Sequence, residues 1–255
     1  MGEGRLVDIG SLMTGNGRAA AHLHHGSGGA ADTVIMAGPE KYATGSTTVE
    51  RMVGDILVEF FVYQPFGPRW IHAHSPGGEW VEAISSEYSV TLYHTDGTVS
   101  RVEGPQLLGP RLNPSEHERA QATIDRNLQR FDLGNYPFEI LDHKPPLANI
   151  FFDQSGRLWV EKTRAEGEEM READVYAGSV LVARYRWPRR VSVGNVPWVT
   201  ESMLYGTTRD SLGVPRVARV QLESDSCVAP YLLTRDADLH VWEPPKRVLF
   251  MLTPK

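Results

Sequence analysis

The sequence predicts an all-β fold built from repeated hairpins, and two observations lead to that prediction. The first is a strand–turn–strand pattern that occurs twice, as HSPGGEWVEA at 74–83 and as FDQSGRLWVEK at 152–162. In each copy a polar turn ends in a glycine, Gly78 or Gly156, just before a short apolar strand, which is typical of a β-hairpin. Because repeated hairpins bury their apolar faces against one another, the pattern indicates a repeat architecture.

The second observation is that each hairpin continues into another pair of strands. Turns at Gly97 and Gly178 separate segments that alternate apolar and polar residues, and these segments lie at 88–93, 98–102, 173–176 and 180–185. Two four-stranded units of this kind predict the blades of a β-propeller.

A helical insert at about 106–138 separates the two units, which otherwise lie too far apart for blades of about 40 to 50 residues. The helix is predicted from Pro114 to Phe131, with Asn113 or Ser115 as N-cap, acidic residues in the first turn and Gly134 just past the end. Its few apolar residues recur at spacings of three and four, so one narrow face is expected to pack on the sheets while the rest is solvated.

Further strands on both sides extend the pattern to about four blades. They are predicted at 17–25, 32–36, 54–63, 201–206 and 215–222. We therefore predict one partial propeller domain at 1–223, followed by a tail at 224–255. The tail lacks the blade pattern, although 239–242 and 247–252 are candidates for edge strands.

Several motifs in a fixed order suggest a family. They are Asp32-Thr33 before a strand, PFGPR at 65–69, YSVTL at 88–92 with Asp96-Gly97, the helical insert, and KPPLANIFFDQSGRLWVE at 144–161. In this order the chain resembles bacterial six-bladed β-propeller proteins of the NHL-like group over roughly residues 20–223. The resemblance implies an all-β propeller with no general catalytic motif, in a group whose members are often exported or lipid-anchored.

The length of the chain departs from that family. Six blades of about 40 residues each and an insert need more than 255 residues, so the amino-terminal blades are expected to be missing. An incomplete ring exposes strand edges that can pair with another chain. The sequence is therefore expected to be a fragment of a longer product or to close the gap by self-association.

The charge of the chain indicates which classes of partner to expect. The net charge of −6 argues against a general nucleic-acid binder, which carries a clustered basic footprint. The one basic run with interleaved aromatic residues, RYRWPRR at 184–190, is interpreted as a strand with a solvated face. The partner is expected to be a protein or a small molecule.

Targeting features are few. Cys227 is the single cysteine, so no intramolecular disulfide forms. Neither a signal peptide nor an apolar stretch long enough to span a membrane is found. The chain as given is expected in the cytoplasm, and export is expected if its amino terminus is incomplete.

Two groups of residues suggest metal chemistry as an alternative. His72 and His74 lie two apart on a predicted strand and so share a face, and Glu79 after the turn can complete a facial metal site. This spacing is similar to the first motif of cupins, but the second cupin motif is not found. Lactonase-like propellers, the other metal-dependent alternative, place acidic residues and Asn around a central channel, for which Asn149, Asp153 and Asp174 are the candidates.

The residues favour a non-catalytic binding or interaction module over either metal-dependent enzyme. No Gly-x-Ser-x-Gly motif is present, and Cys227 has no nearby histidine to serve as base. We therefore assign no catalytic, cofactor-binding or metal-binding residue, and no cofactor. Ligand contacts are expected from loops at one mouth of the ring, while Trp80, Tyr88 and Trp159 are expected to pack between blades.

Overall fold

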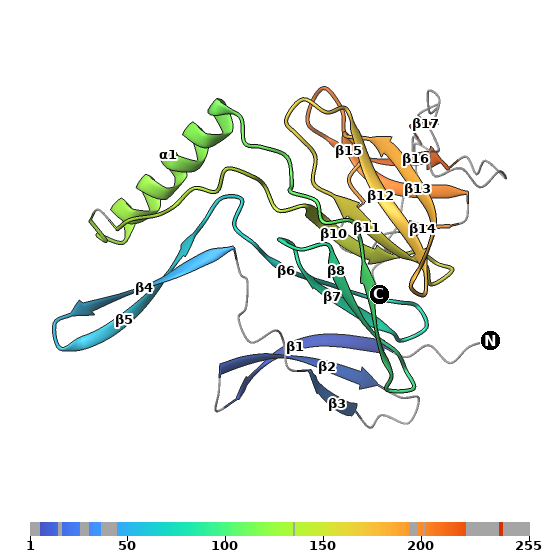
Figure 1. The fold of residues 1–255 in the computed structure, drawn as a ribbon, viewed down its shortest axis with the longest axis horizontal. Helices are drawn as coiled ribbons and strands as arrows, with labels where there is room; N and C mark the ends of the chain where they lie inside the picture. The colour runs from blue at the N-terminus through green and yellow to red at the C-terminus, as the bar shows by residue number, and fades with distance from the viewer. Residues whose placement is uncertain are drawn as a thin grey trace, which may run out of the picture.

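The computed structural model describes residues 6–14, 17–25, 31–36, 45–134, 136–193, 198–200, 202–222 and 240–241. Its elements are almost all β-strands, with one helix between the ninth and tenth strands (Figure 1). The predicted all-β class with four-stranded units and a helical insertion is confirmed.

Three consecutive sheets have four strands each in the described part of the chain, and all are antiparallel. Sheet I contains β6 (Trp70–His74), β7 (Trp80–Ile84), β8 (Ser89–Tyr93) and β9 (Val99–Glu103). Sheet II contains β10 (Leu147–Phe152), β11 (Leu158–Lys162), β12 (Met170–Ala177) and β13 (Val180–Pro188). Sheet III contains β14 (Trp198–Val199), β15 (Met203–Arg209), β16 (Pro215–Gln221) and β17 (His240–Val241).

Two smaller sheets precede these. One has the strands β1 (Leu6–Thr14), β2 (Gly17–His25) and β3 (Ala31–Met36), and the other is the hairpin of β4 (Ser46–Val53) and β5 (Ile56–Tyr63). The strands at β1, β4 and β14 were not predicted from the sequence. Of the predicted edge strands in the tail, β17 falls within 239–242, and 247–252 lies outside the described residues.

The repeated hairpins are formed as predicted. Gly78 and Gly156 have φ values of 89° and 79°, which side chains with a Cβ rarely adopt, so glycine allows both turns to close. Asp153 fixes the second turn, because one carboxylate oxygen accepts hydrogen bonds from the backbone N–H groups of Ser155 and Arg157, each at 2.9 Å.

The core consists of two apolar layers, each shared by neighbouring sheets. Between sheets I and II lie residues such as Val81, Leu92, Ile150 and Leu158. The other layer joins sheets II and III, and it contains Phe151, Trp159, Val175, Tyr185, Trp187, Leu204 and Val220. Because alternate residues of a strand face opposite sides, sheet II is buried on both faces. This explains why β11 is an unbroken apolar run through Val160 rather than an alternating one.

The first strands of sheets I and II lie side by side, which is the arrangement of successive propeller blades (Figure 1). The N–H of Leu147 at the start of β10 donates to the carbonyl of Ser85, at 3.1 Å. Tyr88, next to β8, donates its hydroxyl to Asp174 on β12 at 2.6 Å. Sheets I and II are thus joined by polar as well as apolar contacts.

Helix α1 (Pro114–Arg130) has the predicted N-cap at Asn113, with a capping box to Glu116. Its buried residues are Glu116, Ala120, Ile124 and Leu128, and the helix contacts β5. Phe131 follows it and lies 5.5 Å from Phe60, measured between ring centroids. In the described residues no helix is both long and apolar enough to cross a membrane.

Candidate functional site

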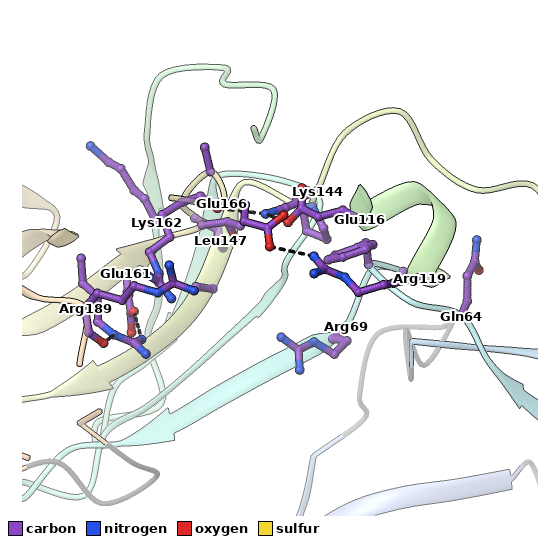
Figure 2. Close-up of a pocket in the computed structure, with 18 of the residues that line it drawn as sticks. Gln64, Arg69, Glu116, Arg119, Lys144, Leu147, Glu161, Lys162, Glu166 and Arg189 are labelled. Atoms are coloured by element: carbon purple, nitrogen blue, oxygen red, sulfur yellow. Dashed lines mark hydrogen bonds and ion pairs between the residues drawn. The ribbon is translucent and has the colours of Figure 1, made fainter. Parts of the chain in front are cut away.

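A pocket of about 580 Å³ lies between helix α1 and the first strands of sheets I and II (Figure 2). Its lining comes from four separate parts of the chain: the segment before β6, the first turns of α1, the start of β10, and the region from the end of β11 to the end of β13. Residues remote in sequence therefore converge on one cavity, as in most ligand sites.

The lining is strongly basic. It contains seven cationic side chains against three carboxylates, Glu116, Glu161 and Glu166. The cations are Arg69, Arg119, Lys144, Lys162, Arg164, Arg171 and Arg189. This positive excess stands out in a chain with a net charge of −6.

Each of the three carboxylates already has a cationic partner. Glu116 pairs with Lys144, and both side chains are buried. Glu161, also buried, lies 2.6 Å from the Arg171 guanidinium. The third carboxylate, Glu166, lies 2.8 Å from that of Arg119.

Lys162 is paired with two carboxylates that do not line the pocket. Its Nζ lies 2.9 Å from Glu172 and 3.1 Å from Asp174. Three arginines of the pocket, Arg69, Arg164 and Arg189, therefore remain without a carboxylate ion pair in the part of the chain that the structure describes.

The titration behaviour of the pocket follows from these contacts. Burial raises the pKa of Glu161, and the charge of Arg171 offsets only part of that effect. Glu166 accepts hydrogen bonds from Asn113 and Arg119, which lower its pKa to about 2. Burial and then the nearby charges of Arg189 and Arg171 lower the pKa of Arg164. The basic groups thus lie close enough to repel one another.

Two further cavities adjoin the pocket through shared residues. One of about 370 Å³ is also lined by Arg69, Glu161 and Arg171, and it adds Asn149. The other, of about 440 Å³, is also lined by Arg164 and Arg189. The basic surface therefore continues beyond the main pocket on two sides.

The residues of the cupin-like alternative lie on and beside sheet I. His72 and His74 are on β6, with ring centroids 6.3 Å apart, on the face that also holds Trp80. The carboxylate of Glu79 lies 2.7 Å from Nδ1 of His94. Within the described residues no group of three or more His, Cys, Asp or Glu side chains is arranged to hold a metal ion.

The residues of the lactonase-like alternative are occupied by separate structural roles. Besides the turn contacts, Asp153 accepts from Arg157 Nε at 2.7 Å and from Trp159 Nε1 at 3.0 Å. The amide oxygen of Asn149 accepts from the N–H of Ile150 at 3.0 Å. Asp174 belongs to the network between sheets I and II, so these three residues form no common cage.

The Asp174 network combines ion pairs with tyrosine hydroxyls around a buried carboxylate. Arg184 Nε lies 2.5 Å from Asp174, Lys162 lies on its other oxygen, and the Tyr88 hydroxyl is also 3.2 Å from that of Tyr176. Burial raises the pKa of Asp174, but the hydrogen bonds from Arg184 and Tyr88 and the charge of Lys162 outweigh it and hold the pKa below its ordinary value. We assign this network to the packing of two sheets.

The three aromatic residues expected between blades are all buried. Tyr88 contacts sheet II through its hydroxyl, and Trp159 belongs to the layer between sheets II and III. Trp80 stacks on Tyr93 at 4.6 Å, on the face of sheet I that does not meet sheet II.

The basic pocket was not predicted from the sequence. Its arginines come from segments spread between residues 69 and 189, and each segment alone has ordinary charge. The run at 184–190 gave a partial signal, since Arg189 lines the pocket, whereas Arg184 and Arg186 pair with acidic residues of β12.

Known proteins show only weak similarity to this chain. No family model and no curated protein matches the chain. Among solved structures, it is similar to a streptogramin B lyase with a TM-score of 0.27 and 11% identity, over 84% of this chain and 68% of that one. It is also similar to virginiamycin B lyase from Staphylococcus aureus with a TM-score of 0.25 and 11% identity, over 96% of this chain and 86% of that one.

Proposed function

We propose that this protein is a non-catalytic binding module of β-propeller type, related to the six-bladed NHL-like group, whose ligand occupies the basic pocket. The observation that carries the proposal is the convergence of side chains from the segment before β6, from α1 and from sheet II on a single cavity of about 580 Å³. Loops and strand ends at the junction of rigid sheets are common places for binding residues.

The metal-dependent alternatives have less support. A metal at His72 and His74 would need Glu79 to leave His94, and a metal at Asp153 would displace the donors that hold the β10–β11 turn. Both changes would cost contacts that stabilise sheets I and II, whereas a ligand in the pocket displaces no contact within the sheets.

A pocket-filling variant tests the proposal without assuming the charge of the ligand. Ala165 lines the pocket on the loop after β11, so Ala165→Trp should obstruct the cavity. Ala177→Trp is the matched control, because Ala177 is exposed at the end of β12 and does not line the pocket.

Ligand-observed NMR with a mixed set of small acids, amines, sugars and amides would be run on all three proteins. We expect at least one compound to bind the unmodified protein and Ala177→Trp, unchanged by incubation, and to lose binding in Ala165→Trp. Chemical conversion of a bound compound, equal binding to Ala165→Trp, or no binding at all would overturn the proposal.

Self-association through open sheet edges is a second part of the proposal. The β4–β5 hairpin is two-stranded in the described residues, and it exposes Ile56, Leu57 and Phe61, with Phe61 64% exposed. Exposed apolar strands of this kind are prone to pairing. Sedimentation velocity at micromolar concentration should show a dimer or larger species, and a monomer would contradict this part.

A further inference from the structure

The arginines without carboxylate ion pairs indicate the chemistry of the ligand. We propose that the pocket recognises a small molecule carrying at least two oxyanion groups, phosphoryl or carboxylate, bound by Arg69, Arg164 and Arg189. This inference rests on the proposed function, because it names the ligand class of the same pocket.

The first argument is the availability of the guanidinium groups. Those of Arg69 and Arg189 make no hydrogen bond or ion pair with any residue that the structure describes. Arg164 donates to the backbone carbonyl of Glu168 at 3.1 Å and to no carboxylate oxygen. Guanidinium groups match the planar geometry of carboxylates and phosphates and bind them through paired hydrogen bonds.

The second argument is the electrostatic cost of holding these cations close together. Arg164 is half-buried, and the charges of Arg189 and Arg171 act on it from nearby. Like charges held close together destabilise one another, and an anion between them removes that repulsion. Binding an anion is therefore favoured by the arrangement of the cations as well as by the new hydrogen bonds.

The third argument concerns the number of anionic groups. The three arginines come from three separate segments of the chain: before β6, after β11 and just after β13 (Figure 2 labels Arg69 and Arg189). A cavity of about 580 Å³ falls in the range of sites for whole small molecules, which is about 300–1,000 Å³. Three guanidinium groups that line one cavity from separate segments suit a ligand with two or more oxyanion groups.

The surroundings favour a small ligand over a long acidic polymer. Glu166, Glu168 and Glu169 are exposed on the loop that borders the pocket. A nucleic acid or acidic peptide that continued past the pocket would meet these carboxylates and be repelled, whereas a small molecule ends before it reaches them.

Isothermal titration calorimetry with three probes tests this inference. The probes are pyrophosphate and citrate, which carry several oxyanion groups, and orthophosphate, which carries one. We expect pyrophosphate or citrate to bind, and orthophosphate to bind at least about tenfold more weakly, since it lacks the charged hydrogen bonds that a second oxyanion group makes. If pyrophosphate binds more tightly than citrate, the ligand carries phosphoryl groups; if citrate binds more tightly, it carries carboxylates.

Charge-removing variants locate the binding. Arg69→Gln and Arg189→Gln should each weaken the tighter probe at least about tenfold. Arg126→Gln, which removes the same charge from an exposed position on α1 outside the pocket, should leave its affinity within about twofold. Both pocket arginines are exposed, so these variants are expected to fold.

The inference is overturned if neither pyrophosphate nor citrate binds, or if both pocket variants bind as tightly as the unmodified protein. If a neutral or cationic compound binds the unmodified protein and fails to bind Ala165→Trp, the proposed function is kept and the oxyanion ligand is overturned. The two hypotheses therefore fail by different results.

Discussion

Replacing Trp159 with alanine should destabilise the protein more than any other single truncation we propose. Its side chain has no exposed surface and stacks on Tyr185 at 4.9 Å and on Phe151 at 5.5 Å, with Trp187 against its edge. Loss of a buried Trp side chain costs about 3–5 kcal/mol, which includes the cavity that it leaves. The variant also loses the indole hydrogen bond to the buried Asp153, so we expect a value near the upper end of this range.

Trp159→Phe separates the two contributions. Phenylalanine keeps much of the stacking but removes the donor to Asp153, so it should cost about 1–2 kcal/mol beyond the loss of ring volume. Asp153 keeps its contact with Arg157, which limits the penalty.

The assay is urea unfolding followed by far-UV circular dichroism, which does not depend on the fluorescence of the residue that is changed. Trp198→Ala is the control, because Trp198 is 58% exposed, and its cost should stay within about 0.5 kcal/mol. A loss below about 1 kcal/mol for Trp159→Ala, with an unchanged slope against urea, would refute the packing of sheets II and III described above.

Four other changes have expected outcomes in the same unfolding assay. Tyr88→Phe removes a buried hydroxyl that donates to Asp174, so it should cost about 1.5–3 kcal/mol, and no measurable cost would contradict the contact between sheets I and II. The pKa of Asp174 is lower in the folded state than in the unfolded state, so the unfolded state binds more protons between the two pKa values and stability should fall as pH decreases through that window. Asp174→Asn should flatten that fall, and an unchanged acid profile would refute the assignment. Lys144→Met leaves Glu116 buried without its partner and should cost about 3–5 kcal/mol, much of which Glu116→Leu in the same chain should restore. Asn113→Ala removes the N-cap of α1 and should cost about 1 kcal/mol, whereas Ser115→Ala, at the second position of the helix, should cost less.

Local patterns in the sequence predicted most of the strands. Gly78 and Gly156 mark turns because glycine alone adopts their backbone angles easily, and α1 begins just after Asn113 because the Asn113 side chain accepts a hydrogen bond from a free N–H group of the first turn. Such signals act within a few residues. The exposed, mostly polar strand β4 and the two-residue strand β14 have no strong signal of this kind, since pairing with a neighbour defines them.

The candidate site depends on contacts between distant residues, so it could not be predicted in the same way. Glu161 and Arg171 look like exposed strand residues in the sequence, but in the structure they form a largely buried pair beside the pocket. His72 and His74 were correctly placed on one face of a strand. The Glu79 carboxylate, however, contacts His94, and the position of His94 depends on the pairing of the strands that follow.

The burial of sheet II on both faces has a consequence for synthesis on the ribosome. Domains form from the amino terminus as the chain emerges, so sheet II can pack on sheet I while the face with Phe151, Trp159 and Trp187 still waits for sheet III. In that interval a large aromatic surface is exposed to water and to other nascent chains. A chain that stalls before β15 should therefore require chaperones to stay soluble, even though sheets I and II are complete.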